Sequence, residues 1–232
     1  MQLFRDKKHY VSSIWPELLM FKKDDHLLFE FSKQLETFSS AVYGGGFRKV
    51  SHFVNWQVPL DYASNDPIKL MEDKIVGWEY PVQQTIGLQT AAKIHCASIQ
   101  EEQGDEFRIV CCVTAGVGNR ARSGKKQRTY SAYKCGTINT FLFIDGRLTE
   151  SAMINGIITA TEAKTAALQD LQIKVDTGEF ATGTTTDSVV LAASQAHHFP
   201  THLFAGTATT IGNAIGCLVY DATCEAVRNQ EG

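Results

Sequence analysis

The segment Gly178–Ala193, GEFATGTTTDSVVLAA, constrains the fold of this chain more than any other. It joins a bend that holds two glycines and three consecutive threonines to a short apolar run. Glycine permits a positive φ and a close backbone approach, and threonine hydroxyls can bond to neighbouring amides instead of a strand ladder. We therefore expect the chain to turn here and to present Asp187 at the mouth of a short buried strand.

Two other segments have the same composition. Thr114–Asn119 (TAGVGN) follows the apolar run Ile109–Val113, and Ala205–Asn213 (AGTATTIGN) precedes a helical pattern. One hypothesis is that the three turns meet around a single pocket. Three unrelated tight turns are the alternative, and the residues alone do not decide between them.

Strand patterns and helix patterns alternate along the chain, which predicts an α/β fold. The opening strands flank a triple-glycine turn, so antiparallel pairing is expected there. No linker or internal repeat is visible, and residues 1–232 are interpreted as a single domain with a mixed, partly antiparallel sheet flanked by helices. The arm Met1–Asp25 receives no element, and Gly87–Cys96 fits a helix or a strand. The expected strands are His26–Phe31, Lys49–Pro59, Phe107–Val113 and Gly136–Asp145, and the expected helices are Asp66–Trp78, Thr149–Leu171 and Thr209–Val227.

The helix Thr149–Leu171 carries two kinds of face when its residues are placed at about 100° per residue. Lys164 falls within the apolar arc, so it must either extend to solvent or pair with a carboxylate, for which Asp187 is the candidate. In the last helix, Gly212 and Gly216 lie four apart and allow a close backbone approach. The apolar arc is Met153, Ile154, Ile157, Ile158, Leu168 and Leu171, the polar arc is Ser151, Asn155, Thr159 and Glu162, and the last helix has Ile211, Ile215, Leu218, Val219 and Ala222 in register.

Overall charge argues against two classes of partner. A net charge of −3 and a pI of about 6.2 give no attraction to nucleic acid or to an anionic membrane. Five cations between Arg120 and Arg128 indicate a solvated loop or a contact with an acidic substrate. No secretory signal is visible, so a cytoplasmic protein is expected.

Cysteine and histidine spacing indicates neither a disulfide framework nor a metal site. The six cysteines form no C-x-x-C pair, which favours reduced core thiols, with the neighbours Cys111 and Cys112 facing opposite ways on a buried strand. His198 and His202 are separated by Pro200, which spoils a helical ligand pair, and His197 adds no nearby cysteine to complete a set. We expect no metal.

Several residues are candidates for chemistry. Asp187 can act as a general base on a water within about 2.6–3.2 Å, although a turn or helix-capping carboxylate is the alternative. Glu162 is either a second such acid or a solvent-facing side chain. A nucleophile among Thr184, Thr185 and Thr186 needs an adjacent base, and no signature of one is present. The TAGVGN amides can form an oxyanion hole, but the spacing of a nucleotide-binding loop is absent.

Seven segments together resemble the adenosylcobinamide amidohydrolases of corrinoid salvage. They keep the order of that family and cover roughly residues 39–220. Arg120 departs from the small residue expected after Gly-Asn, and Met1–Phe31 has no counterpart. The segments are Ser39–Gly45, Asn55–Pro59, Thr114–Asn119 with Arg122 and Gly124, Gly136–Asn139, Asn155–Leu168, Ala181–Val190 and Ala205–Gly216.

The resemblance implies hydrolysis of the amide that joins the aminopropanol arm of adenosylcobinamide to the corrin, giving adenosylcobyric acid. Asp187 or Glu162 would activate water, and Lys164 would pair with that carboxylate. Trp56 would cover the apolar face of the corrin. The corrinoid is the substrate, and no cofactor is required. The implied substrate-binding residues are Gly116, Gly118, Asn119, Arg122, Asn139, Asn155, Thr184, Thr185, Thr186 and Thr207.

Two other functions stay open beside this one. A corrinoid-binding protein without catalysis would use the same turns, although the chain has no D-x-H-x-x-G ligand motif for base-off cobalamin. The second open function is that of an amidohydrolase that acts on a different amide. The sequence also leaves a homo-oligomer open.

Overall fold

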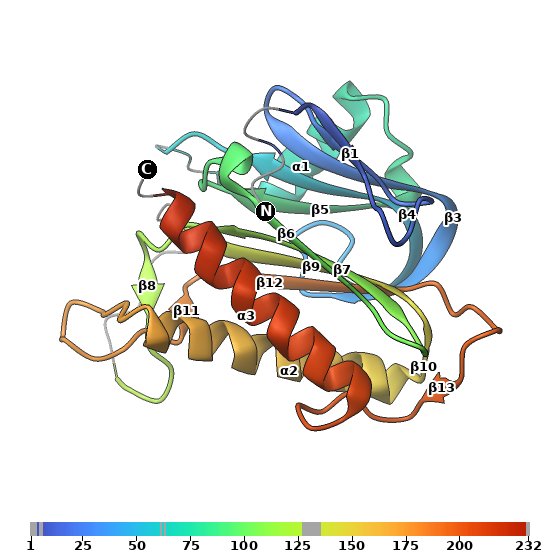
Figure 1. The fold of residues 1–232 in the computed structure, drawn as a ribbon. Helices are drawn as coiled ribbons and strands as arrows, with labels where there is room; N and C mark the ends of the chain where they lie inside the picture. The colour runs from blue at the N-terminus through green and yellow to red at the C-terminus, as the bar shows by residue number, and fades with distance from the viewer. Residues whose placement is uncertain (1–3, 5–6, 61, 63, 127–135, 231–232) are drawn as a thin grey trace.

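A nine-stranded sheet forms the centre of the protein in its computed structural model, which describes residues 4, 7–60, 62, 64–126 and 136–230 (Figure 1). The strands are β1 (His9–Val11), β2 (Leu19–Lys22), β3 (His26–Ser39), β4 (Gly46–Gln57), β5 (Thr85–Thr90), β6 (Ser98–Gln103), β7 (Arg108–Ala115), β8 (Arg120–Ala121), β9 (Ile138–Asp145), β10 (Arg147–Leu148), β11 (Gly183–Thr184), β12 (Ser188–Ala193) and β13 (Thr201–His202). The helices are α1 (Pro67–Gly77), α2 (Glu150–Asp170) and α3 (Thr210–Gln230), with 3-10 turns at Val82–Gln84 and Ile94–Cys96.

The sheet is mixed, which confirms the predicted class. Its main path runs β1-β2-β3-β12-β9-β7-β6, while β4 pairs with β3, and β5 pairs with β4. β12 lies parallel to β9 and antiparallel to β3. The helix α2 connects β9 to β12, so these two strands and α2 form a β-α-β unit at the centre of the sheet.

The opening of the chain forms antiparallel strands, as predicted. β3 and β4 are joined through the glycine turn, where Gly44 and Gly46 have φ of +71° and +88°. β3 continues beyond the predicted Phe31 to Ser39, with an irregular register between Glu30 and Leu35. The unassigned arm contributes β1 and β2 to the sheet edge because its apolar side chains, Trp15, Leu18 and Met20, are buried.

The two neighbouring cysteines mark the two faces of the sheet. Cys111 packs in the core beneath α2 and α3, and Cys112 packs in the core on the opposite face, among Phe29 and Phe141. Burial raises the pKa of the Cys112 thiol to about 12. The cysteines in the described ranges are free thiols, and Cys217 alone among them is exposed; Cys135 lies outside these ranges.

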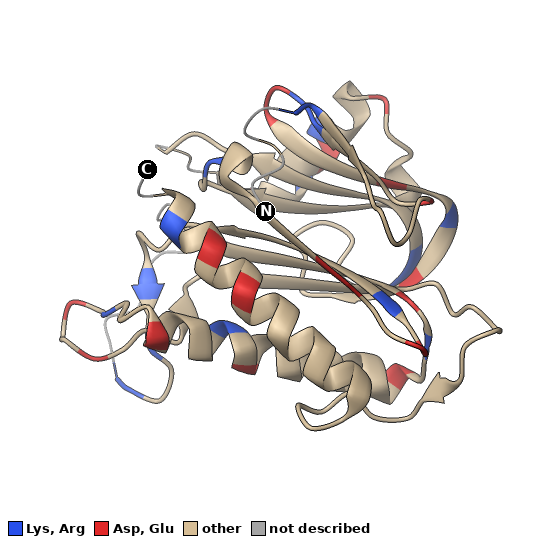
Figure 2. Cartoon of the chain, viewed as in Figure 1, with Lys and Arg blue, Asp and Glu red and all other residues tan. Residues whose placement is uncertain are grey.

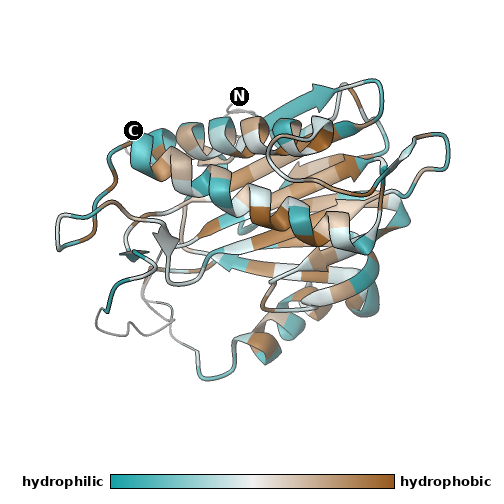
Figure 3. Cartoon of the chain, turned by 90° about the horizontal axis from the view of Figure 1, so that it is seen from below, coloured by the Kyte–Doolittle hydropathy of each residue, from teal (hydrophilic) through white to brown (hydrophobic). Residues whose placement is uncertain are grey.

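The helix α2 begins and ends close to its predicted limits, but its buried face differs in part from the predicted arc. Figure 3 views the two long helices from below, with hydrophobic residues on the side that faces the viewer. Ile154 and Ile158 are 49% and 50% exposed, whereas Thr159, predicted on the polar arc, is 1% exposed. Small residues such as Gly156 face the sheet, where a Cβ would lie 2.7 Å from Leu191 Cδ1. Met153 and Leu168 of the predicted arc are fully buried, as expected, but close packing at Gly156 leaves Ile154 and Ile158 outside.

The helix α3 confirms the predicted register, since Ile211, Ile215, Leu218, Val219 and Ala222 are all buried. Its two glycines differ. A Cβ at Gly212 would lie 2.0 Å from the Gly206 carbonyl oxygen, whereas the nearest atom to a Cβ at Gly216 is Thr159 Cγ2 at 3.8 Å. Only Gly212 is needed for a close backbone approach. No helix in the described ranges is long and apolar enough to cross a membrane.

Replacement of Gly212 by alanine should lower the free energy of unfolding by about 1–3 kcal/mol, because the added methyl group meets backbone that cannot move freely. Gly216→Ala, four residues further along the same helix, should leave that free energy unchanged or raise it by up to about 1 kcal/mol through helix propensity. Urea unfolding measures both. Equal losses in the two variants would contradict this assignment.

Candidate functional site

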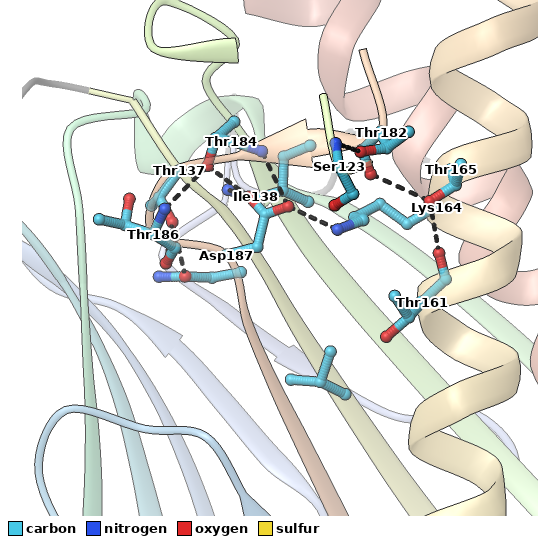
Figure 4. Close-up of polar contacts among 12 residues, drawn as sticks. Ser123, Thr137, Ile138, Thr161, Lys164, Thr165, Thr182, Thr184, Thr186 and Asp187 are labelled. Atoms are coloured by element: carbon cyan, nitrogen blue, oxygen red, sulfur yellow. Dashed lines mark hydrogen bonds and ion pairs between the residues drawn. The ribbon is translucent and has the colours of Figure 1, made fainter. Parts of the chain in front are cut away.

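The candidate site lies at the amino ends of the two parallel strands β9 and β12. Asp187 immediately precedes β12, and Ile138 begins β9. Because α2 runs back between these strands, its second half brings Lys164 to the same place (Figure 4). The Asp187 and Lys164 side chains are 14% and 10% exposed.

Four donors surround the Asp187 carboxylate. Oδ1 accepts hydrogen bonds from the Ile138 amide at 3.1 Å and from the Thr184 hydroxyl. Oδ2 accepts from the Thr184 amide at 3.0 Å and from Lys164 Nζ at 2.5 Å. A carboxylate offers about four lone-pair sites, so every one of them is used. The predicted pairing of Lys164 with Asp187 is confirmed.

Gly183 makes room for this ion pair. A Cβ at this position would lie 2.3 Å from Asp187 Oδ2 and 2.7 Å from Lys164 Nζ. The residue also belongs to β11, which pairs with β8 through Gly183 and Ala121. Only glycine therefore lets the chain pass between the pair and the neighbouring ribbon.

Two of the three predicted turns converge here. Asn119, at the end of the TAGVGN turn, donates from Nδ2 to the Thr185 hydroxyl at 2.7 Å. The Thr137 hydroxyl donates to the Thr186 carbonyl at 2.8 Å, and the Thr186 hydroxyl donates to the Gly136 carbonyl at 2.9 Å. A cavity of about 450 Å³ opens beside them, lined by Ser123, Thr161, Lys164, Thr184, Thr185 and Asp187 among others.

A buried amide network supports these turns from within the sheet. Asn139 Nδ2 donates to Asn55 Oδ1 at 2.8 Å and to the Gln89 carbonyl at 3.0 Å, and Asn55 Nδ2 donates to the Thr114 hydroxyl at 2.9 Å. Asn139 is 1% exposed. In this arrangement the amide protons of Asn139 are committed to the protein, and its contact with substrate stays a prediction.

The third turn lies against a different face of α2. Asn155 Oδ1 accepts from the Ala205 amide at 3.0 Å, the Thr159 hydroxyl donates to the Ala205 carbonyl at 2.7 Å, and the Thr207 hydroxyl donates to Glu162 Oε2 at 3.0 Å. Glu162 and Thr207 line a separate hollow of about 360 Å³ between α2 and α3. The hypothesis of one pocket shared by all three turns is wrong, because the polar stripe of α2 binds this turn on the opposite side from Lys164.

Three further residues that were expected to contact substrate make contacts within the protein instead. The Gly116 amide donates to the Thr137 carbonyl at 2.8 Å, which removes it from an oxyanion hole, whereas Gly118 lies exposed at the turn. Arg122 Nη1 donates to the Phe180 carbonyl at 2.7 Å. Trp56 is 6% exposed and packs beneath α1, so the expectation that it covers a corrin is wrong.

The described part of the basic segment, residues 120–126, lies near the loop that precedes the threonine turn (Figure 2). Arg120 donates to the Lys174 carbonyl and lies 3.7 Å from Asp176, and Lys125 lies 2.7 Å from Glu179. The Lys125 hydrogen bond lowers the pKa of Glu179. Arg120 and Lys125 thus contact residues 174–179 of this loop; Arg128 lies outside the described residues.

The three histidines considered as metal ligands, His197, His198 and His202, lie away from the Lys164–Asp187 ion pair. His197 and His198 line a cavity that also contains Asp145 and Ser194, at the carboxyl ends of β9 and β12. The His202 ring packs against Phe107. The absence of a metal stays a prediction.

The sequence interpretation missed several hydroxyl residues that line the cavity together with Lys164. Thr161 and Thr165 lie on the same face of α2 as Lys164, and the Thr165 hydroxyl donates to the Thr182 carbonyl at 3.0 Å. The Ser123 amide donates to the Thr182 hydroxyl at 2.9 Å. The i, i+3 and i+4 spacing of Thr161, Lys164 and Thr165 is the signal that points to this face.

Gly183→Ala should separate the ion pair and destabilise the protein by about 1–3 kcal/mol, whereas Gly77→Ala, at the exposed end of α1 with no atom within 4 Å of the added Cβ, should be nearly neutral. Lys164→Met should lower the free energy of unfolding by about 3–5 kcal/mol, because it leaves the Asp187 carboxylate without its counter-charge. The double variant Gly183→Ala, Lys164→Met should cost less than the sum of the two, since each change breaks the same pair. Additive losses in a double-mutant cycle would refute this coupling.

Comparison with known proteins places the chain in a family. The family model for adenosylcobinamide amidohydrolase matches residues 15–232. An uncharacterized protein of Methanocaldococcus jannaschii is 28% identical over 239 residues, covering 91% of this chain and 89% of the relative. An adenosylcobinamide amidohydrolase of Methanosarcina mazei is 32% identical over 150 residues, which span 64% of each protein.

A solved structure, that of the PH0078 protein from Pyrococcus horikoshii, aligns with a TM-score of 0.42 at 8% identity, covering 88% of this chain and 76% of that one. The family match extends on both sides of the segments that carried the resemblance, and it includes β2 and all of β3. The chain belongs to the adenosylcobinamide amidohydrolase family.

Proposed function

We propose that this chain hydrolyses the amide bond between the aminopropanol arm and the corrin of adenosylcobinamide, giving adenosylcobyric acid for cobalamin salvage. Family membership supports the substrate class. The observation that carries the proposal is the Lys164–Asp187 ion pair at a hydroxyl-lined cavity. This cavity is built from segments that matched the family in the sequence.

The groups at the cavity suit amide hydrolysis. An unactivated amide needs a proton acceptor for the attacking oxygen, donors for the oxyanion, and a proton for the departing amine. Asp187, oriented by Lys164, is the acceptor in this proposal. The Thr185 hydroxyl, which accepts a hydrogen bond from Asn119, can donate its own proton to the carbonyl oxygen.

The size of the cavity indicates which part of the substrate enters. A volume of about 450 Å³ is typical of sites for small ligands, and the adenosylated corrin is much larger. The aminopropanol arm and the scissile amide therefore enter, while the ring stays at the opening. The reaction as proposed uses no resident cofactor or metal, and we place it in the cytoplasm.

Purified protein incubated with adenosylcobinamide should release aminopropanol and form adenosylcobyric acid, measured by liquid chromatography with mass spectrometry. Asp187→Asn should lower turnover by about 10²–10⁴-fold, because the amide accepts no proton. Glu162→Gln should keep most turnover, because that carboxylate faces Thr207 in the other hollow. Activity should also survive a chelator.

Three results would overturn parts of this proposal. Binding of adenosylcobinamide without release of aminopropanol would indicate a corrinoid-handling protein. Loss of turnover in Glu162→Gln with normal turnover in Asp187→Asn would move the site to the hollow between α2 and α3. Loss of activity in the chelator, restored by a divalent ion, would show that a metal is required.

A further inference from the structure

We propose that the Thr184 hydroxyl is the nucleophile of this reaction, so that hydrolysis passes through an ester between Thr184 and the acyl group of the corrin. This inference rests on the proposed function and specifies which oxygen attacks the amide. It follows from the contacts of Asp187 and from the different surroundings of the three threonines.

The first observation is that Asp187 has no lone pair left for a water. Its four acceptor positions are filled by two backbone amides, by Lys164 Nζ and by the Thr184 hydroxyl. The backbone amides do not give up a proton in such a reaction, and a proton from Lys164 would only neutralise the ion pair. The Thr184 hydroxyl is therefore the group whose proton Asp187 can accept.

The second observation is that the three threonines are not equivalent. The Thr186 hydroxyl donates to the Gly136 carbonyl, and the Thr185 hydroxyl accepts from the Asn119 amide. Thr184 is the member of the three whose hydroxyl contacts a carboxylate. A hydroxyl nucleophile needs such an adjacent base, which the linear sequence could not show.

The third observation is that Thr184 is accessible and held in place. It is partly exposed and lines the 450 Å³ cavity beside Lys164 and Asp187. Its amide and its hydroxyl bond to opposite oxygens of the same carboxylate. The backbone and the side chain are therefore positioned together, which lowers the entropy cost of attack.

The reaction then balances in two halves. In the first, Thr184 Oγ forms a bond to the amide carbon, its proton passes to Asp187 and then to the departing nitrogen, and the C–N bond breaks to release aminopropanol. In the second, a water occupies the place of the amine, its oxygen bonds to the ester carbon, and its proton passes through Asp187 to Thr184 Oγ as the C–Oγ bond breaks. The sum is amide plus water giving acid plus amine.

Hydroxylamine distinguishes this route from direct attack by water. Turnover of adenosylcobinamide in hydroxylamine should convert part of the acid product into the hydroxamate, with no loss of aminopropanol release, because hydroxylamine competes with water for the ester. Intact-protein mass spectrometry after rapid acid quenching should show the corrinoid acyl group on the protein, and peptide mapping should place it at Thr184. A sample without enzyme controls for direct aminolysis.

Variants of the turn give a second readout. Thr184→Val keeps the shape of the side chain and should lower aminopropanol release by about 10³-fold or more, without hydroxamate. Thr184→Ser keeps the hydroxyl and should still form the hydroxamate. Thr177→Val makes the same change on the exposed loop and should behave as the unchanged protein. If Thr184→Val does not fold, the hydroxamate formed by Thr184→Ser and the product analysis still test the ester route.

The outcomes separate the two proposals. Normal aminopropanol release with acid as the sole product in hydroxylamine, or release by folded Thr184→Val within about tenfold of the unchanged protein, would overturn the ester route and leave the proposed function standing. No release of aminopropanol by the unchanged protein would overturn the proposed function and the ester route together.

Discussion

The arrangement of the candidate site depends on the largely buried ion pair between Lys164 and Asp187. Removing two charges from water costs several kcal/mol for each ion, which attraction offsets only where further hydrogen bonds complete the geometry. Asp187 receives them from the Ile138 amide and from both the amide and the hydroxyl of Thr184. One carboxylate thereby joins the amino ends of two strands, the threonine turn and α2.

The pair also accounts for the position of the candidate site in the fold. In open parallel sheets, ligands usually bind outside the carboxyl ends of the strands. At that end of β9 and β12, Asp145 is bonded to Arg108 at 3.1 Å and to the Ser194 hydroxyl at 2.7 Å. The hydroxyl-lined cavity lies at the opposite end, because that is where α2 delivers Lys164.

Local pattern predicted the three helices and the central strands but not β1, β2 or β6, and it predicted the contacts between elements only in part. The capping residue Asp66 and the following proline predicted the start of α1, and a cation within an apolar arc predicted a carboxylate partner for Lys164. The same arc placed Ile154 and Ile158 inside, where the structure has small residues. Hydropathy alone does not predict the distance between two packed elements, and a short distance excludes large side chains.

The sequence by itself determined the α/β class, the limits of the long helices, the pairing of Lys164 with an acid, and the family to which the motifs belong. The tertiary structure decided which turns meet, where Glu162 faces, and which threonine touches Asp187. Those outcomes depend on strand order: Asp187 meets Ile138, 49 residues away, because β9 and β12 are neighbours in the sheet. Periodicity along a chain predicts which face of an element is buried, but it does not predict which other element packs against that face.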